Sequence, residues 1–302
     1  MTVDYLQFFP ARVRDSGPPP VVSQWRRWRG MDVHVHRAGD PSAPVKLVVL
    51  HGAGGHGRML LPYTGLLGPV EMTAPDMPGY GLTRTNGRPV DYAAWVDLAA
   101  DLVAGERDRD GRPVIVLGAS IGGMLAYSAV ARTGADGLAV TCLLDVRDAA
   151  VRAAAARFAP LGRAARPGMN VLRPLDPLRV PVRWLARMTA MANRADLNAA
   201  VSGDRLGGGG RVSLRFLRTY LNSVPEVEPE RFTACPVLMA HPAEDRWTPV
   251  ELSLPFFDRI AAAKRLVMLE GCGHMPVEEP GLGQLARALR EFTAAAAAGP
   301  AR

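Results

Sequence analysis

Apolar runs alternate with glycine- or proline-rich bends along much of this chain. Each run is four to eight residues long, the length and character of a strand buried on both faces of a sheet. Alternating polarity in "MDVHVHRAG" predicts a half-exposed strand, and "WRRWRG" predicts an amphipathic first strand. Buried strands are expected in the segments 45–52 and 114–117, and further strands in 138–145, 235–242 and 264–271. The segment 70–81 is expected to be a strand followed by a Pro/Gly loop.

Helical periodicity follows several of these runs. A helix is predicted from residue 92 to about 106, with Asp91 as its N-cap and a buried stripe of Trp95, Leu98, Ala99 and Leu102. The segment 124–130 predicts a helix after a glycine-rich turn. The last helix has one apolar face, and the terminal "AAAAAGPAR" is expected to fray. The apolar face consists of Leu282, Leu285, Leu289 and Phe292.

Residues 146–233 show no buried-strand pattern and predict a largely helical insertion. We therefore divide the chain into a first core part (1–145), a cap insertion (146–233) and a second core part (234–302). Two candidate helices in the cap carry apolar stripes, which we expect to pack on the core or on each other. If some faced the cleft, the substrate pocket would be apolar and adaptable. The glycine run 207–210 is either a hinge or a slack loop. The stripes are Trp184, Leu185, Met188 and Met191, and Leu214, Leu217, Tyr220 and Leu221.

Strands that alternate with helices predict an α/β fold, with a mostly parallel sheet covered by helices on both faces. Functional residues of such sheets gather at the carboxyl ends of the strands. Polar residues follow the predicted strands at this edge: His51, Asp76, Ser120, Asp245 and His274.

Composition narrows the class of protein. The chain has 302 residues, 48% of them apolar, which is enough for a sizeable core. No apolar run reaches the ~20 residues of a membrane span, and the N-terminus lacks the pattern of a secretory signal. Three cysteines without CxxC spacing argue against a disulfide framework or a zinc site. We expect a cytoplasmic protein without integral membrane association.

The formal charge of +7 invites a nucleic-acid hypothesis. Lysine occurs only at positions 46 and 264, so almost all of the positive charge is arginine. The arginines are spread along a chain rich in Ala, Gly and Pro, which is typical of a GC-rich genome. With no nucleic-acid motif present, we expect no nucleic-acid partner.

The stretch "VIVLGASIGGMLAY" places Ser120 in a turn between a strand and a helix. A serine hydroxyl becomes a nucleophile when a base removes its proton and a carboxylate orients that base. The chain offers these groups in the order Ser120, Asp245, His274.

Five motifs in this order resemble the α/β-hydrolase fold over most of the chain: "HGAGGHGR", "APDMPGYGLT", "GASIGG", "HPAEDRWTP" and "GCGHMPVEEP". The first is similar to the oxyanion loop of lysophospholipase and monoacylglycerol-lipase relatives. The resemblance implies that Ser120 attacks an acyl carbonyl, that His274 is the base and that Asp245 is the acid. It also implies that the backbone N–H groups of Ala53 and Ile121 bind the oxyanion, and that no metal or organic cofactor is needed.

Other residues compete for some of these roles. Glu244 lies beside Asp245, and Asp145 ends an earlier strand, from which some relatives take their acid. Asp76 is interpreted as a loop brace. His34 and His36 have the spacing of a metal-binding pair, but two ligands are too few, so we expect solvated strand histidines.

Four further features receive structural interpretations. We expect His51 and His56 to shape the oxyanion loop, Cys272 to fill apolar space, and "YLQFFP" near the N-terminus to pack on the core. His241 stands where many relatives have glycine, and no consequence follows from the sequence.

Three functions remain open. The first is hydrolysis of a carboxylic ester or thioester with a hydrophobic acyl part. The second is acyl transfer, or cofactor-free perhydrolysis, by the same triad with an acceptor other than water. The third is ligand binding without catalysis. The sequence leaves the oligomeric state open.

Overall fold

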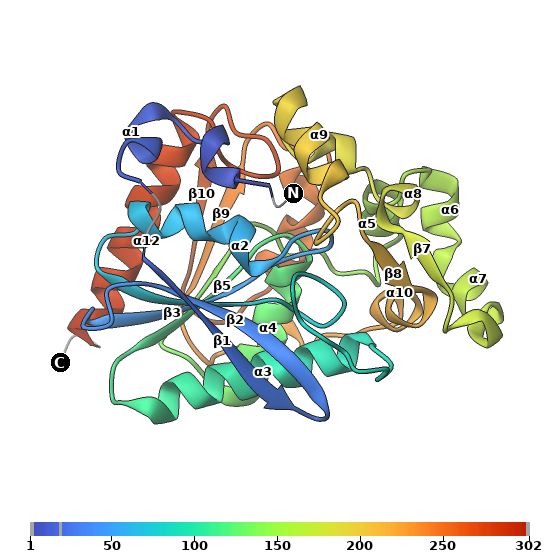
Figure 1. Ribbon diagram of the computed structural model, residues 1–302, viewed down its shortest axis with the longest axis horizontal. Coiled ribbons are helices and arrows are strands. Elements are labelled where there is room, and N and C mark those ends of the chain that lie inside the picture. Colours follow the sequence, from blue (N-terminus) through green and yellow to red (C-terminus); the bar gives the residue numbers. More distant parts are fainter. Residues whose placement is uncertain (1–2, 18–19, 300–302) are drawn as a thin grey trace.

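A computed structural model describes residues 3–17 and 20–299 of the chain. An eight-stranded sheet runs through its centre in the order β1-β2-β4-β3-β5-β6-β9-β10 (Figure 1). The strands are β1 (Val21–Trp28), β2 (Met31–Gly39), β3 (Val45–Leu50), β4 (Val70–Pro75), β5 (Val114–Gly118), β6 (Gly137–Val140), β9 (Val237–Pro242) and β10 (Lys264–Leu269).

The predicted mostly parallel sheet is confirmed. Strand β2 pairs antiparallel with both β1 and β4, whereas every pairing from β4 to β10 is parallel. Every residue of β3, β4 and β9 is buried, which fits their largely apolar sequences, although β3 contains Lys46 and β4 contains Glu71. The carboxyl ends of the parallel strands therefore meet at one edge of the sheet.

Helices cover both faces of the sheet. One face packs against α3 (Tyr92–Arg109) and α4 (Ile121–Thr133), and the other against α12 (Gly281–Ala298) and the 3₁₀ helix η2 (Leu61–Leu66). The predicted N-cap of α3 is confirmed, because the Asp91 carboxylate accepts the N–H of Ala94 at 2.9 Å.

The predicted apolar face of the last helix is confirmed, but its predicted frayed tail is wrong over five alanines. Leu282, Leu285 and Leu289 of α12 are buried and Phe292 packs against the core beside them. Residues 294–298 continue the helix, as alanine's high helix propensity favours. Residues 300–302 lie outside the described part of the chain.

Two interpretations near the N-terminus are corrected. Strand β1 is not amphipathic: it is an edge strand on which only Trp28 is buried. His34 and His36 are buried rather than solvated, because β2 lies between β1 and β4. The expected packing of the N-terminal aromatic segment is confirmed, since Tyr5, Phe8 and Phe9 join the core.

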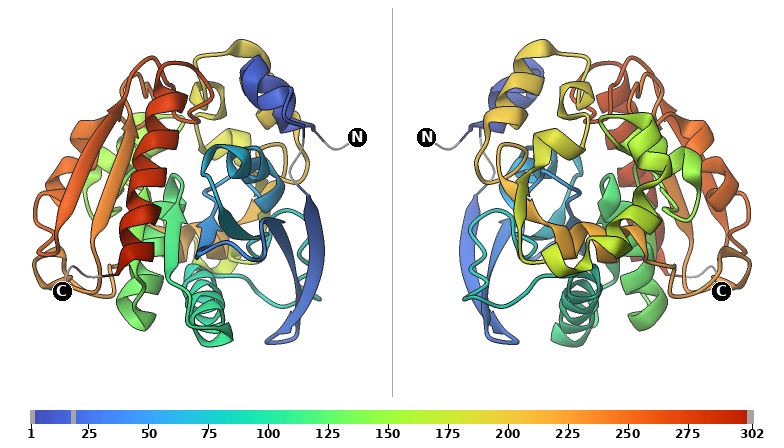
Figure 2. Two further views of the ribbon diagram at one scale, coloured as in Figure 1. Left: turned by 90° about the vertical axis from the view of Figure 1, so that its left-hand side faces the viewer. Right: turned by 90° about the vertical axis from the view of Figure 1, so that its right-hand side faces the viewer.

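The cap follows β6 and projects from one end of the molecule (Figures 1 and 2). It is largely helical, as predicted, but also contains a two-stranded antiparallel sheet of β7 (Arg179–Pro181) and β8 (Arg211–Ser213). Its helices are α5 (Ala149–Ala155), α6 (Ala159–Arg163), α7 (Ala165–Val171), α8 (Val182–Leu185), α9 (Ala195–Gly203) and α10 (Leu214–Leu221), with 3₁₀ turns η3 (Arg173–Leu175), η4 (Met188–Ala190) and η5 (Pro229–Arg231).

The predicted cap helix that carries Trp184, Leu185, Met188 and Met191 is wrong as one element. Helix α8 ends at Leu185 because Ala186 leaves it to form a bridge with Ala156. Met188 and Met191 then turn into the core, while Trp184 stays exposed. The second predicted cap helix is confirmed as α10, which packs Tyr220 against Tyr92 of α3.

No helix in the described residues has both the length and the hydropathy needed to cross a membrane.

Candidate active site

Ser120 occupies a strained turn between β5 and α4. Its backbone has φ 57° and ψ −128°, a region that residues other than glycine seldom enter. The Ser120 N–H donates to Thr141 Oγ1 at 3.0 Å, so the residue after β6 steadies the turn. Such strain persists only where the surroundings enforce it, which makes this turn a candidate functional position.

Glycines around Ser120 permit backbone-to-backbone contact. A Cβ at Gly118 would overlap the carbonyl oxygen of Gly122, and a Cβ at Gly123 would overlap that of Cys142. The loop after β6 therefore packs directly under the start of α4. Strand β6 ends at Val140, earlier than the predicted strand to residue 145.

His274 and Asp245 form the pair that the sequence suggested. The His274 Nδ1–H donates to Asp245 Oδ2 at 2.7 Å, and both residues are buried. Asp245 Oδ1 accepts the N–H groups of Trp247 and Thr248 at 2.9 and 2.8 Å, and the Thr248 hydroxyl donates to Oδ2 at 2.9 Å. Burial alone would raise the pKa of Asp245, but these hydrogen bonds, led by that of His274, hold it below its usual value.

The competing acids lie elsewhere. Asp145 accepts hydrogen bonds from the Arg147 guanidinium at 2.7 and 2.9 Å, and Glu244 is exposed. Within the described residues, Asp245 is the carboxylate bonded to His274. His274 Nε2 is buried and has no hydrogen-bond partner among them, and His274 lines the same cavity as Ser120.

The loop after β3 lies against the serine turn. A Cβ at Gly52 would be 2.7 Å from Ser120 Cβ and 3.1 Å from the backbone N of Ile121. The next residue, Ala53, lines the cavity that Ser120 and His274 share. The two residues whose N–H groups were predicted to bind an oxyanion, Ala53 and Ile121, thus lie in adjoining segments next to Ser120.

His51 shapes this loop in its neutral form. Its Nδ1–H donates to the carbonyl of Gly52 at 2.8 Å, and its Nε2 accepts the N–H of Met77 at 2.9 Å. Protonation at Nε2 would remove that acceptor. Burial lowers the pKa of His51 to about 4.

His56 connects the same loop to the cap. Its Nε2–H donates to Asp204 Oδ2 at 2.9 Å, and the Tyr5 hydroxyl donates to the same oxygen at 2.8 Å. All three side chains are buried. The sequence analysis missed Tyr5 and Asp204, because nothing local relates residues 5, 56 and 204.

The glycine run of the cap is packed rather than slack. A Cβ at Gly207 would overlap the carbonyl oxygen of Gly54, and a Cβ at Gly54 would be 3.2 Å from the Cα of Gly208. The cap backbone therefore touches the residue that follows Ala53.

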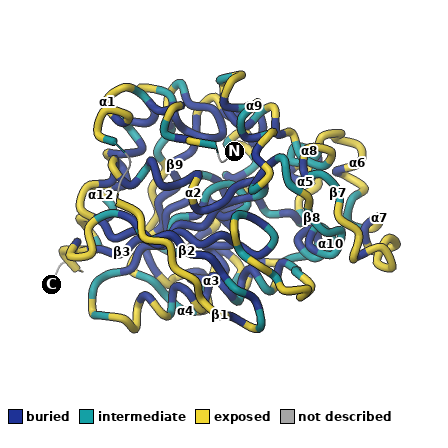
Figure 3. The backbone as a smooth tube through the Cα atoms, in the orientation of Figure 1, coloured by how far each residue is buried: buried dark blue, intermediate teal, exposed yellow. Residues whose placement is uncertain are grey.

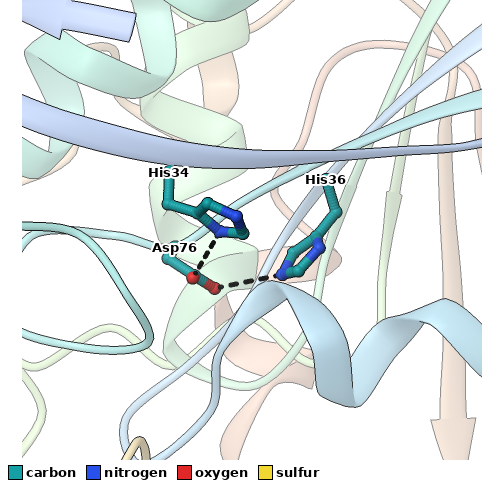
Figure 4. Close-up of side chains that lie close together, drawn as sticks. All are labelled: His34, His36 and Asp76. Carbon is teal, nitrogen blue, oxygen red and sulfur yellow. Dashed lines mark hydrogen bonds and ion pairs between the residues drawn. The ribbon is translucent and has the colours of Figure 1, made fainter. Parts of the chain in front are cut away.

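Asp76, His34 and His36 form a buried cluster between β2 and the loop after β4 (Figure 4). Asp76 accepts the N–H of Gly57 on Oδ1, and the N–H of Leu82 and His34 Nδ1–H on Oδ2, all at 2.8–2.9 Å. These bonds outweigh burial and lower the pKa of Asp76 to about 2, whereas burial lowers that of His36 to about 4. Since three lone pairs of the carboxylate are already used, the cluster is a loop brace, as interpreted for Asp76.

Two residues with no predicted chemistry support neighbouring loops. His241 lies with Nδ1 2.9 Å from the carbonyl oxygen of Pro242 and Nε2 3.1 Å from that of Thr248, so it spans the loop that carries Asp245. Cys272 is buried, and its thiol, whose pKa burial raises to about 12, donates to the carbonyl of Glu278.

A cavity of about 80 Å³ extends from Ser120 and His274 into the layer between the sheet and α12. Most of its wall is apolar side chains of the core, and Met191 is the cap residue that contributes to it. The cap stripes therefore mainly pack on the core, as expected. The apolar wall includes Val49, Met72, Leu117, Leu67, Leu285 and Leu289.

Most of the chain matches a family of known proteins. Residues 47–288 match the family model described as the alpha/beta hydrolase family. The lipase LipV of Mycobacterium tuberculosis is 36% identical over 118 residues, which span 38% of this chain and 42% of the lipase. The aligned part is thus less than half of that relative.

Two solved structures have similar folds. A soluble variant of monoglyceride lipase from Saccharomyces cerevisiae superposes with a TM-score of 0.73 at 14% identity, covering 95% of this chain and 97% of that one. The monoacylglycerol lipase of Paleococcus ferrophilus gives 0.63 at 18% identity, with 86% and 98% covered.

The neutral histidines predict acid sensitivity. In the unfolded chain His51 and His36 take up protons near pH 6.5, whereas in the folded chain they do so near pH 4. The unfolded state thus binds more protons in this window, so the free energy of unfolding falls as the pH drops from about 6.5 to 4. We expect His51 alone to contribute about 2–3 kcal/mol of this loss, measured by urea unfolding.

His51→Gln separates titration from packing. The variant is expected to be less stable than wild type at pH 8 but to lose less stability between pH 7 and 4. A slope of stability against pH equal to that of wild type would contradict the assignment to His51.

The packing of Gly207 on Gly54 predicts that Gly207→Ala is destabilising by about 1–3 kcal/mol, because the new methyl group overlaps a carbonyl oxygen. Gly203→Ala is the matched control. A Cβ there meets no atom within 4 Å, and alanine favours the helix that Gly203 ends. Thermal unfolding of both variants is the measurement, and equal melting temperatures would show that the contact is not tight.

Proposed function

The chain belongs to the alpha/beta hydrolase family, and from this premise we propose that it is a serine hydrolase. It cleaves carboxylic esters or thioesters with a hydrophobic acyl part, using Ser120, His274 and Asp245. The observation that carries the proposal is the 2.7 Å hydrogen bond from His274 to Asp245 beside a cavity that His274 shares with Ser120.

We infer the following reaction for these groups. Ser120 Oγ attacks the acyl carbonyl carbon while His274 Nε2, which has no competing partner among the described residues, takes the hydroxyl proton. Asp245 stabilises the resulting imidazolium without taking a proton itself. His274 then protonates the leaving alcohol or thiol, and an acyl-enzyme remains. Water repeats the sequence and releases the acid.

An oxyanion forms on the carbonyl oxygen in each step. We propose that the N–H groups of Ala53 and Ile121 bind it, an assignment supported by the contact between the Gly52 backbone and the serine turn. One such donor contributes about 3–4 kcal/mol to the transition state. The positive φ of Ser120 also supports oxyanion binding, since the serine then lies between the loop after β3 and the start of α4.

The acyl part enters the apolar cavity between the sheet and α12. Its apolar walls suit a hydrocarbon chain and offer few groups for a charged one. Residues 146–233 act as a cap over the site, between core parts 1–145 and 234–302. Met191 in the cavity wall and Gly207 against Gly54 support this arrangement.

A fluorophosphonate tests the nucleophile directly. We expect wild type to gain one phosphonyl group as the Ser120 Oγ–P bond forms and fluoride leaves. Ser120→Ala, once its melting temperature has been checked against that of wild type, is expected to gain none. Intact-mass analysis is the measurement. A well-folded wild type that stays unlabelled, or an adduct on Ser120→Ala, would rule out the proposal.

The acid is tested by a pair of matched variants. Asp245→Asn should reduce kcat for a short-chain p-nitrophenyl ester by about 10³–10⁴-fold, because the imidazole loses its orienting charge. Asp145→Asn, in a carboxylate paired with Arg147, should retain kcat within a few-fold. If Asp145→Asn lost more activity than Asp245→Asn, the catalytic acid would be Asp145 in the loop after β6.

A further inference from the structure

The outer part of the cap exposes an unusual number of large apolar side chains. Seven of them fall within the 27 residues from 158 to 184, with exposures of 42–79%. Soluble proteins seldom expose contiguous apolar surface of this kind without a binding function. We call this set the cap patch: Phe158, Leu161, Val171, Leu172, Leu175, Leu178 and Trp184.

The members of the cap patch lie near one another. The N–H of Arg157 donates to the carbonyl of Leu185 at 2.7 Å, and Ala156 forms a bridge with Ala186, so Phe158 and Trp184 belong to adjoining segments. Helices α6 and α7 are in contact, and η3 follows α7 directly. Figures 1 and 3 show α6 and α7 as the largely exposed outer end of the cap.

Positive charge accompanies these apolar groups. Segment 157–187 contains seven arginines and a single carboxylate, Asp176. Asp176 is buried and accepts hydrogen bonds from Arg218 at 2.5 and 2.8 Å. Within the described part of the chain, none of the seven arginines forms an ion pair. They are Arg157, Arg163, Arg166, Arg173, Arg179, Arg183 and Arg187.

We propose that the cap patch docks on a phospholipid surface that carries anionic headgroups. Aromatic and aliphatic side chains would enter the boundary between headgroups and acyl chains, and the guanidinium groups would bind phosphates around them. The positive charge of segment 157–187 favours an anionic membrane over other binding partners. A second copy of the chain would bring two strongly positive surfaces together, and a nucleic acid would leave the apolar side chains without an apolar partner.

The inference goes beyond the proposed function and does not depend on it. Vesicle binding can be measured on the Ser120→Ala variant, so loss of docking and loss of catalysis are separable. If both hold, docking brings the cap, which follows β6 at the same edge of the sheet as Ser120, to a surface that dissolves hydrophobic esters.

Co-sedimentation with vesicles tests the proposal. We expect the chain to bind vesicles of phosphatidylcholine mixed with phosphatidylglycerol, to bind pure phosphatidylcholine weakly, and to dissociate at high salt. Phe158→Ser/Trp184→Ser should weaken binding by at least about tenfold, since it removes two interfacial aromatic anchors. Val22→Ser/Trp25→Ser is the matched control, because this pair is equally exposed on β1, away from the cap. It should bind as wild type does.

A charge variant checks the second half of the proposal. Arg173→Gln/Arg183→Gln/Arg187→Gln keeps the apolar groups and should lose the preference for phosphatidylglycerol. Absence of binding to either vesicle overturns the proposal, as does equal binding by the cap-patch variant. A dimer of the wild type in solution that Phe158→Ser/Trp184→Ser dissociates also overturns it, since the occupant is then a second copy.

Discussion

Close backbone packing around Ser120 is the constraint on which the rest of the site depends. The loops after β3 and β6 approach the turn between β5 and α4 so closely that Gly52 and Gly123 have no room for a Cβ. This packing enforces the positive φ of Ser120 and brings the Thr141 hydroxyl to its N–H. The sheet sets the spacing, because β3, β5 and β6 are neighbours whose carboxyl ends are level.

Three buried aspartate–histidine pairs share this edge of the sheet, and their surroundings give them different roles. Asp245–His274, Asp76–His34 and Asp204–His56 all have oxygen–nitrogen distances of 2.7–2.9 Å. Only the first places its histidine in the wall of the cavity with Ser120. The second ties β2 to the loop after β4, and the third ties the cap to the loop after β3. Access to the cavity distinguishes the pair that we propose to be catalytic from the two that connect segments of the fold.

The sequence predicted what depends on local pattern. The strands of the parallel sheet, the N-cap Asp91, the serine turn and the order of Ser120, Asp245 and His274 follow from periodicity, capping chemistry and motif spacing, although β10 is an edge strand on which only Leu269 is buried. Contacts between segments that are far apart in the sequence could not be predicted in this way. Exposure of β1, burial of His34, the end of α8 at Leu185 and the Tyr5–Asp204–His56 link all depend on which segments become neighbours in space. The cavity could not be predicted for the same reason, because its wall is assembled from core strands and helices far apart in the sequence, and Met191 is the one residue of the cap stripes that contributes to it.

The contact between the cap glycines and Gly54 has a consequence for redesign of substrate scope. A cap that touched the core only through side chains could be exchanged between relatives as a module. Here the main chain of residues 207–208 rests on the main chain of residue 54, and Asp204 holds His56. Chimeras should therefore take residues 51–57 and 204–208 from the same parent protein. Combinatorial libraries should vary residues in the outer cap helices instead.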